Sequence, residues 1–325
     1  MLTLERLRPE LIDWHALDTF GDRVVFQTRE WQEFVTRTQA GELVVATVLD
    51  GDDTVGCFTG QVVRRFGLRI LGSPFPGWTT LSMGFNLREG VSRRDATEAL
   101  IPFAFGPLNC VHLELKDRLL EVGDIAGLGL KSTPNVTFEL DLRGDDAILM
   151  GRMTSACRRA VRKAAKTGVV IEEVAGEAFA AEYFEQLVEV FARQELRPSY
   201  GVDRVRELIR CLEPTGRLLL LRARGPDGQS IATGIFPAMN GTAYFWGGAS
   251  KREHQIHRPN EAVFWHAMRY WRDRGMSILD MGGGGDYKRK YGPRELSVPW
   301  LRRSRVPALG HARDIAEKVL TRDVR

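Results

Sequence analysis

Residues 258–292 constrain the fold of this chain more than any other stretch. They read RPNEAVFWHAMRYWRDRGMSILDMGGGGDYKRKYG, which joins a helical pattern, a short apolar run, four glycines and a basic-aromatic end. Pro259 suits a first helical turn because its missing N–H has no intrahelical partner there, and Gly275 suits the position after the last turn. The apolar run 277–281 has the length of a buried strand. The segment therefore predicts a helix, a strand and a flexible exit, which suits the edge of an active site.

The glycine run is similar to the loop of a dinucleotide-binding or methyltransferase fold, but its context contradicts that interpretation. Such a loop opens a strand–loop–helix unit of about thirty residues. Here Pro293, Pro299 and Pro307 follow, so no long helix begins directly after the glycines. No Gly-Lys-Ser/Thr sequence of a phosphate loop follows either. The glycines instead let the backbone leave the strand sharply and approach a ligand or another chain.

Composition limits the class of protein. Of the 325 residues, 43% are hydrophobic and 27% are charged, which is typical of a soluble protein with two domains or one large domain. No apolar segment approaches the roughly twenty residues that span a bilayer, and the charged amino-terminal stretch does not read as a secretory signal. The four cysteines lie far apart, which disfavours a disulfide framework or a structural zinc site. A reducing cytoplasm is the expected location.

Positive charge is concentrated in the second part of the chain. Residues 1–135 carry 14 Lys/Arg and 18 Asp/Glu, whereas residues 136–325 carry 32 and 24. In the helix predicted over 145–167, Arg152, Arg159, Lys163 and Lys166 follow one another on one face. Because a dense basic stripe repels itself, it favours a phosphate-bearing or carboxylate-bearing partner opposite. A solvated basic face is the alternative.

The remaining patterns follow a similar order in both halves. Alternating apolar residues and turn signals predict the strands, and a 3.6-residue period predicts the helices. The second half reads as a strand, helices, a three-strand meander, a helix and a strand. The predicted strands cover 24–26, 43–49, 54–63, 68–71, 111–115, 136–142, 169–174, 217–223, 230–238, 243–248, 277–281 and 298–302. The predicted helices cover 29–38, 92–105, 145–167, 177–193 and 202–212, with a further helix from Pro259.

This order resembles the acyltransferase fold of the GNAT superfamily, here doubled, and in particular its FemAB-like branch. The resemblance is carried by the basic stretch 158–169, the segment AYFWGGAS at 243–250, Pro259, Asn260 and residues 280–292. It implies an α/β (α+β) fold of two tandem GNAT-like domains, each a mixed, mainly antiparallel sheet flanked by helices. The expected domains are residues 1–135 and 136–305, followed by a carboxy-terminal helix over 306–325.

The resemblance also implies the transfer of an activated acyl group to an amine, in a cleft between the two GNAT-like domains. Relatives with tRNA donors use an aromatic-Lys-x-x-aromatic-Gly segment, which falls here on Tyr287, Lys288, Tyr291 and Gly292. A lysine in a partly dry cleft can stabilise the oxyanion of a tetrahedral intermediate or contact a donor phosphate. Tyr287 and Lys288 are therefore predicted to be catalytic.

A general base is needed only if the amine arrives protonated. Asp286 is the preferred candidate because it adjoins Lys288, and the alternatives are Glu114, Glu195 and Asp280. Cys110 and His112 share a strand face and form a possible nucleophile–base pair, but core packing is the better interpretation.

Donor and substrate residues are predicted from the same segments. Ordinary GNAT enzymes hold the pyrophosphate of coenzyme A (CoA) with a glycine-rich turn before a helix, whereas residues 251–258 (KREHQIHR) lack glycine. Phosphate binding here would need side-chain cations. His254 and His257 lack a third ligand at suitable spacing, so no metal site is predicted. The predicted donor-binding residues are Trp246, Gly247, Gly248, Lys251, Arg252, Arg258 and Asn260. The predicted substrate-binding residues are Arg159, Lys163, Arg197, Tyr200 and Tyr291.

Three functions follow from these patterns. The leading hypothesis is an N-acyltransferase that uses acyl-CoA or an acyl-carrier thioester as a co-substrate, without a tightly bound cofactor. Its near rival is an aminoacyl-tRNA-dependent aminoacyl or peptidyl transferase. The third is a non-catalytic GNAT-like module that binds RNA or an acidic protein through the basic helix. For either enzyme the acceptor is an amine on a small molecule, a lipid or a peptide.

Overall fold

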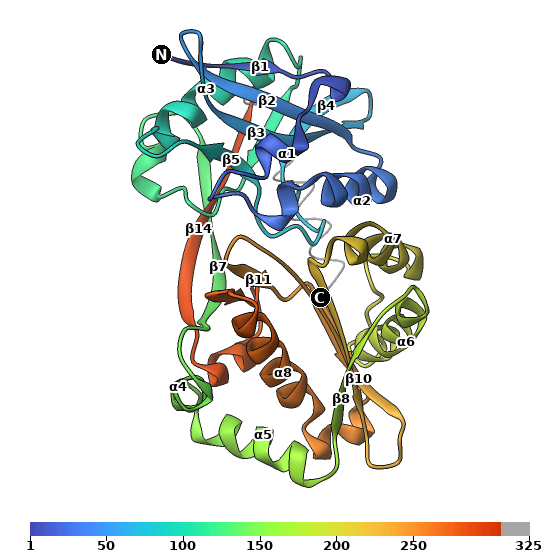
Figure 1. Cartoon of the computed structure of the whole chain (residues 1–325). Helices are drawn as coiled ribbons and strands as arrows, with labels where there is room; N and C mark the ends of the chain where they lie inside the picture. Colours follow the sequence, from blue (N-terminus) through green and yellow to red (C-terminus); the bar gives the residue numbers. More distant parts are fainter. Residues whose placement is uncertain (307–325) are drawn as a thin grey trace. The chain divides into compact units, whose positions relative to one another are not determined.

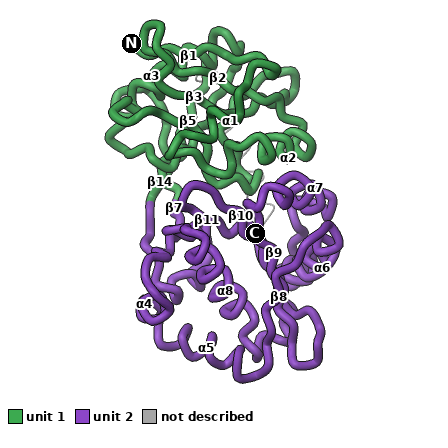
Figure 2. Tube along the Cα trace, in the orientation of Figure 1, with its two compact units in different colours: residues 1–135, 297–325 green, residues 136–296 purple. Residues whose placement is uncertain are grey.

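A computed structural model describes residues 1–306 of the chain (Figure 1). The described residues form two compact units (Figure 2). Unit 1 contains residues 1–135 and 297–306, and unit 2 contains Val136–Leu296. The predicted carboxy-terminal helix lies outside the described residues. Within residues 1–306, no helix has the length and apolar character needed to cross a membrane.

Unit 1 contains a mixed sheet in the order β1-β2-β3-β4-β6-β14, with β5 also paired to β3. Every pairing in it is antiparallel except that of β4 with β6. The strands are β1 (Leu2–Arg6), β2 (Glu42–Asp50), β3 (Asp53–Arg65), β4 (Leu68–Ser73), β5 (Gly84–Leu87), β6 (His112–Leu115) and β14 (Arg294–Ser304).

Helices cover the sheet of unit 1. The middle of β3 is buried without the alternation of a half-exposed strand, which requires a layer on each face. The helix α3 (Arg93–Phe105) places Leu100 and Phe103 in the core of the sheet. Ser92 caps this helix, because its hydroxyl accepts a 3.2 Å hydrogen bond from the amide of Asp95. The helix α2 (Arg29–Gln39) buries Trp31 and Phe34. The short helix α1 (Trp14–Leu17) precedes it.

Five strands of unit 2 repeat the order of those in unit 1, whereas its sixth strand, β7, precedes the others in the chain. Its sheet runs β8-β9-β10-β11-β13-β7, with β12 also paired to β10. Its one parallel pairing among the described strands joins β11 and β13. The strands are β7 (Lys131–Asp141), β8 (Val170–Val174), β9 (Leu218–Arg224), β10 (Ser230–Met239), β11 (Thr242–Tyr244), β12 (Gly247–Ser250) and β13 (Ile278–Asp280).

The helices of unit 2 lie on both faces of its sheet (Figure 1). The helix α8 (Pro259–Asp273) packs with α5 (Ser155–Lys166) on one face, and α6 (Ala178–Ala192) packs with α7 (Val202–Leu212) on the other. Core side chains of α8, including Phe264 and Trp271, meet those of β9 and β10. Each unit is therefore a mixed, mainly antiparallel sheet flanked by helices, as predicted.

Three predicted elements are wrong. Residues 24–26 are not a strand, because Val25–Gln27 form a 3-10 helix. The helix predicted over 145–167 breaks into α4 (Asp146–Arg152) and α5, because the Thr154 hydroxyl accepts a hydrogen bond from the amide of Cys157 and starts a new helix. The third strand of the meander splits into β11 and β12.

Candidate active site

The sheet of unit 2 opens beside β10. The amide of Phe245 donates to the carbonyl of Asp280 in β13 (2.8 Å), whereas the next amide, of Trp246, donates to Ile235 in β10 (3.0 Å). Beyond this point β12 remains paired with β10, and β13 ends. In the described part of the chain, one edge of β12 therefore has no strand partner. Such an edge presents unpaired backbone N–H groups to a ligand, although the carbonyl of Ser250 already accepts a 3.0 Å hydrogen bond from Arg193.

A cavity of about 450 Å³ lies at this opening, and we call it the β12 cavity. Its walls come from β12, the start of α8, the end of α6 and the 3-10 helix η6 (Asp286–Tyr291). Arg193, Arg258 and Lys290 line it with positive charge. Among the described residues no side chain caps the start of α8, so the first N–H groups of the helix and its positive dipole end add to this charge. The β12 cavity is therefore suited to an anionic group.

A partly buried ion pair lies in the wall of the β12 cavity. Glu261, in the first turn of α8, is 7% exposed and accepts a 2.8 Å hydrogen bond from the ammonium of Lys290. That ammonium also lies 5.2 Å from the centroid of the Tyr291 ring. Glu261, Lys290 and Arg193 were not predicted from the sequence. The available signals were an acid in the first helical turn and the third cation of the segment DYKRKY.

Lys288 holds the loop that follows β13. It is 5% exposed, and its ammonium donates to the carbonyls of Met281 (2.6 Å), Gly282 (3.2 Å) and Gly283 (2.7 Å). Burial lowers the pKa of Lys288 to about 8, while the Asp280 carboxylate opposes part of that change. Because backbone carbonyls use all three N–H donors, Lys288 shapes the loop, and an oxyanion would have to displace one of these bonds.

The other residues of this predicted motif separate in space. Tyr287 lines the β12 cavity and is half exposed. The side chain of Asp286 is 92% exposed, pairs with Arg289 and does not line the cavity, so nothing in its surroundings favours a general base. Tyr291 is a core residue packed on Phe264, at 5.0 Å between ring centroids, rather than a substrate contact.

Three of the seven predicted donor residues line the β12 cavity. They are Gly248, Arg258 and Asn260, and the Asn260 side chain ties α8 to β12 through a 3.0 Å bond to Ser250. The other four are not among the lining residues. Trp246 is buried against the ring of Tyr200, and Gly247 packs against the Tyr183 hydroxyl. Lys251 pairs with Glu185, and Arg252 begins a 3-10 helix.

The predicted substrate residues divide in the same way. Arg159 and Lys163 line a second cavity of unit 2, whereas exposed Arg197 lines neither. Tyr200 belongs to an aromatic cluster, because its hydroxyl hydrogen-bonds that of Tyr183 (2.9 Å) and its ring packs on Trp246.

The structure also bears on the Cys110–His112 pair and on a possible metal site. Burial raises the pKa of Cys110 to about 11, and the imidazole of His112 bonds Ser304 (2.7 Å), so the packing interpretation of this pair stands. Among residues 1–306, no group of three or more His, Cys, Asp or Glu side chains is placed to hold a metal ion.

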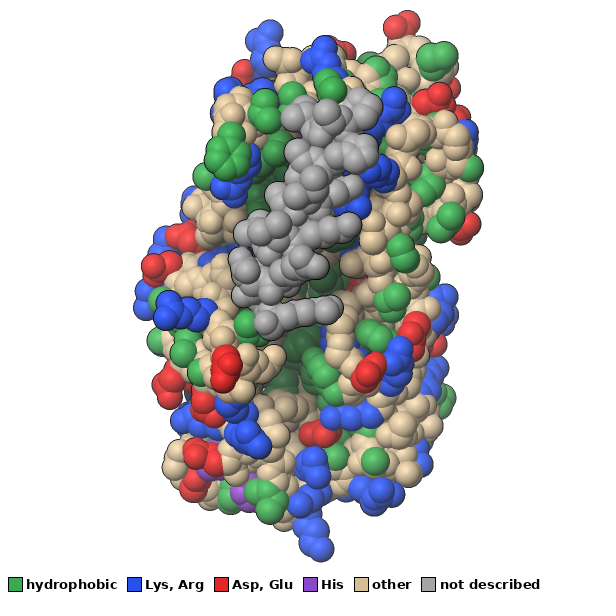
Figure 3. All heavy atoms as spheres, turned by 180° about the vertical axis from the view of Figure 1, so that it is seen from behind, with side chains coloured by type: hydrophobic (Ala, Val, Ile, Leu, Met, Phe, Trp, Pro, Cys, Tyr) green, Lys and Arg blue, Asp and Glu red, His purple; other side chains and the backbone are tan. Residues whose placement is uncertain are grey.

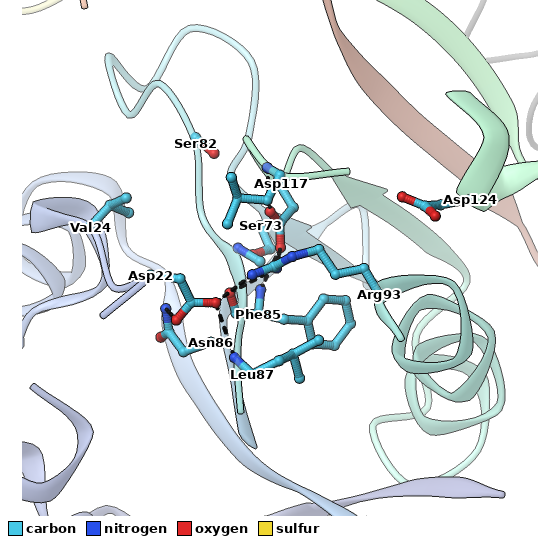
Figure 4. A network of polar contacts seen from close by, with 12 residues as sticks. Asp22, Val24, Ser73, Ser82, Phe85, Asn86, Leu87, Arg93, Asp117 and Asp124 are labelled. Carbon is cyan, nitrogen blue, oxygen red and sulfur yellow. Dashed lines mark hydrogen bonds and ion pairs between the residues drawn. The ribbon is translucent and has the colours of Figure 1, made fainter. Parts of the chain in front are cut away.

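Side chains occupy the corresponding strand edge in unit 1 (Figure 4). There β5 branches from β3 as β12 branches from β10. The amide of Phe85 donates to Asp117 (2.9 Å) and that of Leu87 donates to Asp22 (3.1 Å). Arg93, the first residue of α3, donates to both carboxylates. Burial raises the pKa of the Asp117 carboxyl, and Arg93 opposes this effect. The strand edge that borders a cavity in unit 2 thus meets the protein's own carboxylates in unit 1.

We expect Arg93→Met to lower the free energy of unfolding by about 3 kcal/mol, because it leaves two largely buried carboxylates without their cation. Arg88→Met is the matched control, since Arg88 is exposed nearby, and it should change stability by less than about 0.5 kcal/mol. Chemical denaturation of both variants measures the difference. Equal effects would show that the Asp22–Arg93–Asp117 network does not stabilise unit 1.

In both units a mixed sheet has a branched central strand followed by a helix, which is the arrangement of the GNAT fold. Residues 151–290 match the family described as "Acetyltransferase (GNAT) domain". Over residues 151–290 the chain is therefore similar to the GNAT acetyltransferases, which supports the resemblance stated from the sequence. None of the curated proteins matches it in sequence.

Solved structures share the fold at low sequence identity. FemX is 14% identical, with a TM-score of 0.75 over 91% of this chain and 96% of that one. A tandem GNAT protein from the clavulanic acid biosynthesis pathway is 14% identical, with a TM-score of 0.58 over 94% and 98%. The C-terminal domain of a putative lysylphosphatidylglycerol synthetase from Agrobacterium fabrum is 12% identical, with a TM-score of 0.55 over 88% and 94%. At these identities the likeness shows the fold alone.

Proposed function

We propose that unit 2 binds a CoA thioester in the β12 cavity and transfers its acyl group to an amine. The observation that carries this proposal is the free edge of β12 beside the basic, uncapped start of α8. An extended pantetheine arm can hydrogen-bond to such an edge as an added strand does. Arg193 and Arg258 are placed to neutralise a pyrophosphate at the start of the helix, which replaces the missing glycine-rich turn.

The reaction needs few protein groups. The amine attacks the thioester carbonyl, the C–N bond forms, the C–S bond breaks, and the thiolate leaves as the amine loses a proton. Backbone N–H groups at the free edge of β12 can stabilise the oxyanion that forms in between. Glu261 is the one carboxylate among the residues that line the β12 cavity, so we assign the proton to it in place of Asp286.

The donor is tested by thermal shift, because a ligand that binds only the folded state raises the melting temperature with concentration. We expect acetyl-CoA or a longer acyl-CoA to raise the melting temperature of the chain. In Arg258→Asn the same rise should need a ligand concentration on the order of tenfold higher. Asparagine tolerates the left-handed backbone of residue 258 (φ 62°). Arg206→Asn, on α7 and outside the cavity lining, is the control.

Release of free thiol with a panel of amines then identifies the acceptor class. If bulk tRNA alone stabilises the chain, and this stabilisation weakens as the salt concentration rises, the donor is an aminoacyl-tRNA rather than a thioester. The absence of any shift with CoA thioesters would contradict the proposed donor.

A further inference from the structure

A second cavity of unit 2, of about 710 Å³, lies between α5 and the start of α8, and we call it the α5 groove. Six of its ten lining residues are cationic, and Glu261 is the one acid among them. Lys290 already neutralises that acid. The cations are Arg159, Arg162, Lys163, Lys166, Arg258 and Lys290.

Four of the five cations of α5 face solvent without acidic partners among the described residues. Arg159, Arg162, Lys163 and Lys166 are exposed, and none has an ion pair within residues 1–306. By contrast, Arg210 on α7 pairs with both Glu177 and Glu207. Spacings of three and four residues place the four cations on one helix face. Figure 3 shows Lys and Arg side chains gathered at the end of the molecule where Figure 1 places α5. This uncompensated charge favours an anion.

The α5 groove adjoins the β12 cavity. Arg258, Glu261 and Lys290 line both spaces. Arg258 has the left-handed backbone that non-glycine residues rarely adopt, and such strain clusters at ligand sites. The small side chains Ala156 and Ala160 leave room in the groove between the cations. One elongated molecule can therefore occupy both spaces.

We propose that the α5 groove binds the phosphorylated nucleotide end of the CoA donor, an inference that rests on the proposed function of the β12 cavity. CoA carries a pyrophosphate in the middle of the molecule and a phosphate monoester on its ribose. A monoester holds roughly −1.5 to −2 charges at pH 7 and forms charge-assisted hydrogen bonds with arginine and lysine. Because the groove is separate from the reacting thioester, it contributes to donor affinity and leaves the chemical step unchanged.

The test compares acetyl-CoA with acetyl-3′-dephospho-CoA by titration calorimetry. We expect the wild-type chain to bind acetyl-CoA on the order of tenfold more tightly. In Arg159→Ala/Lys163→Ala this ratio should fall to about one, while the affinity for acetyl-3′-dephospho-CoA stays unchanged. The matched control is Arg64→Ala/Arg65→Ala, which removes two exposed cations of unit 1 and should keep the wild-type ratio.

Equal affinity of the wild-type chain for the two thioesters would overturn this inference and leave the donor cavity standing. Binding of neither thioester would overturn the proposed function, and this inference with it. A short single-stranded RNA forms the third arm. If the wild-type chain binds it, the double variant loses that binding, and the two thioesters bind equally, the groove serves a polynucleotide and the inference fails.

Discussion

Gly292→Ala should lower the free energy of unfolding by about 4 kcal/mol. Gly292 has a φ of 76°, where an alanine costs about 1–2 kcal/mol. A Cβ there would also lie 2.1 Å from the carbonyl oxygen of Arg152, so the backbone of one segment must move. Such overpacking costs about 1–3 kcal/mol more. Because Gly292 ends η6, which carries Tyr287 and Lys290, the same shift should also reduce turnover.

Gly275→Ala separates the two causes. Gly275 has a similar φ of 83°, but within residues 1–306 no atom beyond its two chain neighbours lies within 4 Å of the position of its Cβ. This variant therefore carries only the conformational cost, about 1–2 kcal/mol. Chemical denaturation of both variants measures the difference. Equal losses of stability would show that the contact with Arg152 relaxes freely.

Lys288→Met is expected to lower both stability and turnover. It leaves the carbonyls of Met281, Gly282 and Gly283 without the buried ammonium, at about 1–3 kcal/mol for each group that water does not reach. We expect a total loss of about 3 kcal/mol and a drop in kcat/KM on the order of 100-fold, since a shifted loop misplaces η6. Denaturation and steady-state kinetics of one preparation measure both. A loss of turnover with unchanged stability would instead indicate direct catalysis by Lys288.

The pH profile tests the same lysine. Below about pH 8 the ammonium is protonated and supplies three donors, whereas the neutral amine supplies two. We expect kcat/KM to fall above about pH 8, and Lys288→Arg to keep its activity there. Above about pH 8, where kcat/KM falls, the free energy of unfolding should instead rise. Because folding lowers this pKa from 10.5, the lysine's contribution to stability rises as the pH rises from 8 to 10.5.

Local sequence signals accounted for much of the fold. The helix predicted over 202–212 has the bounds of α7, because its apolar residues repeat at helical spacing. Asn240-Gly241 predicts the turn between β10 and β11, and both residues have positive φ. The split at Phe245 and Trp246 could not be predicted, since it depends on which neighbouring strand each amide meets.

The path of η6 separates residues that the prediction placed together. The prediction grouped Tyr287, Lys288 and Tyr291 as residues of one site. A 3-10 helix has three residues per turn, so Lys288 and Tyr291 share its buried face, while Tyr287 and Lys290 share the cavity face. The sequence DYKRKY contains no signal that distinguishes this turn from an α-helix or a loop. Glu261 was missed because its importance depends on Lys290, 29 positions away.

The Asp22–Arg93–Asp117 network has a consequence for how the chain responds to its substrate. In unit 1 the groups that satisfy the strand edge are covalently part of the protein, so their effective concentration never changes. In unit 2 the proposed acyl donor would supply the corresponding groups from solution. Donor depletion should therefore loosen one half of the chain and leave the other untouched. The rate of local opening in unit 2, and with it the rate of the first cleavage by a protease, should therefore depend on the concentration of the acyl donor.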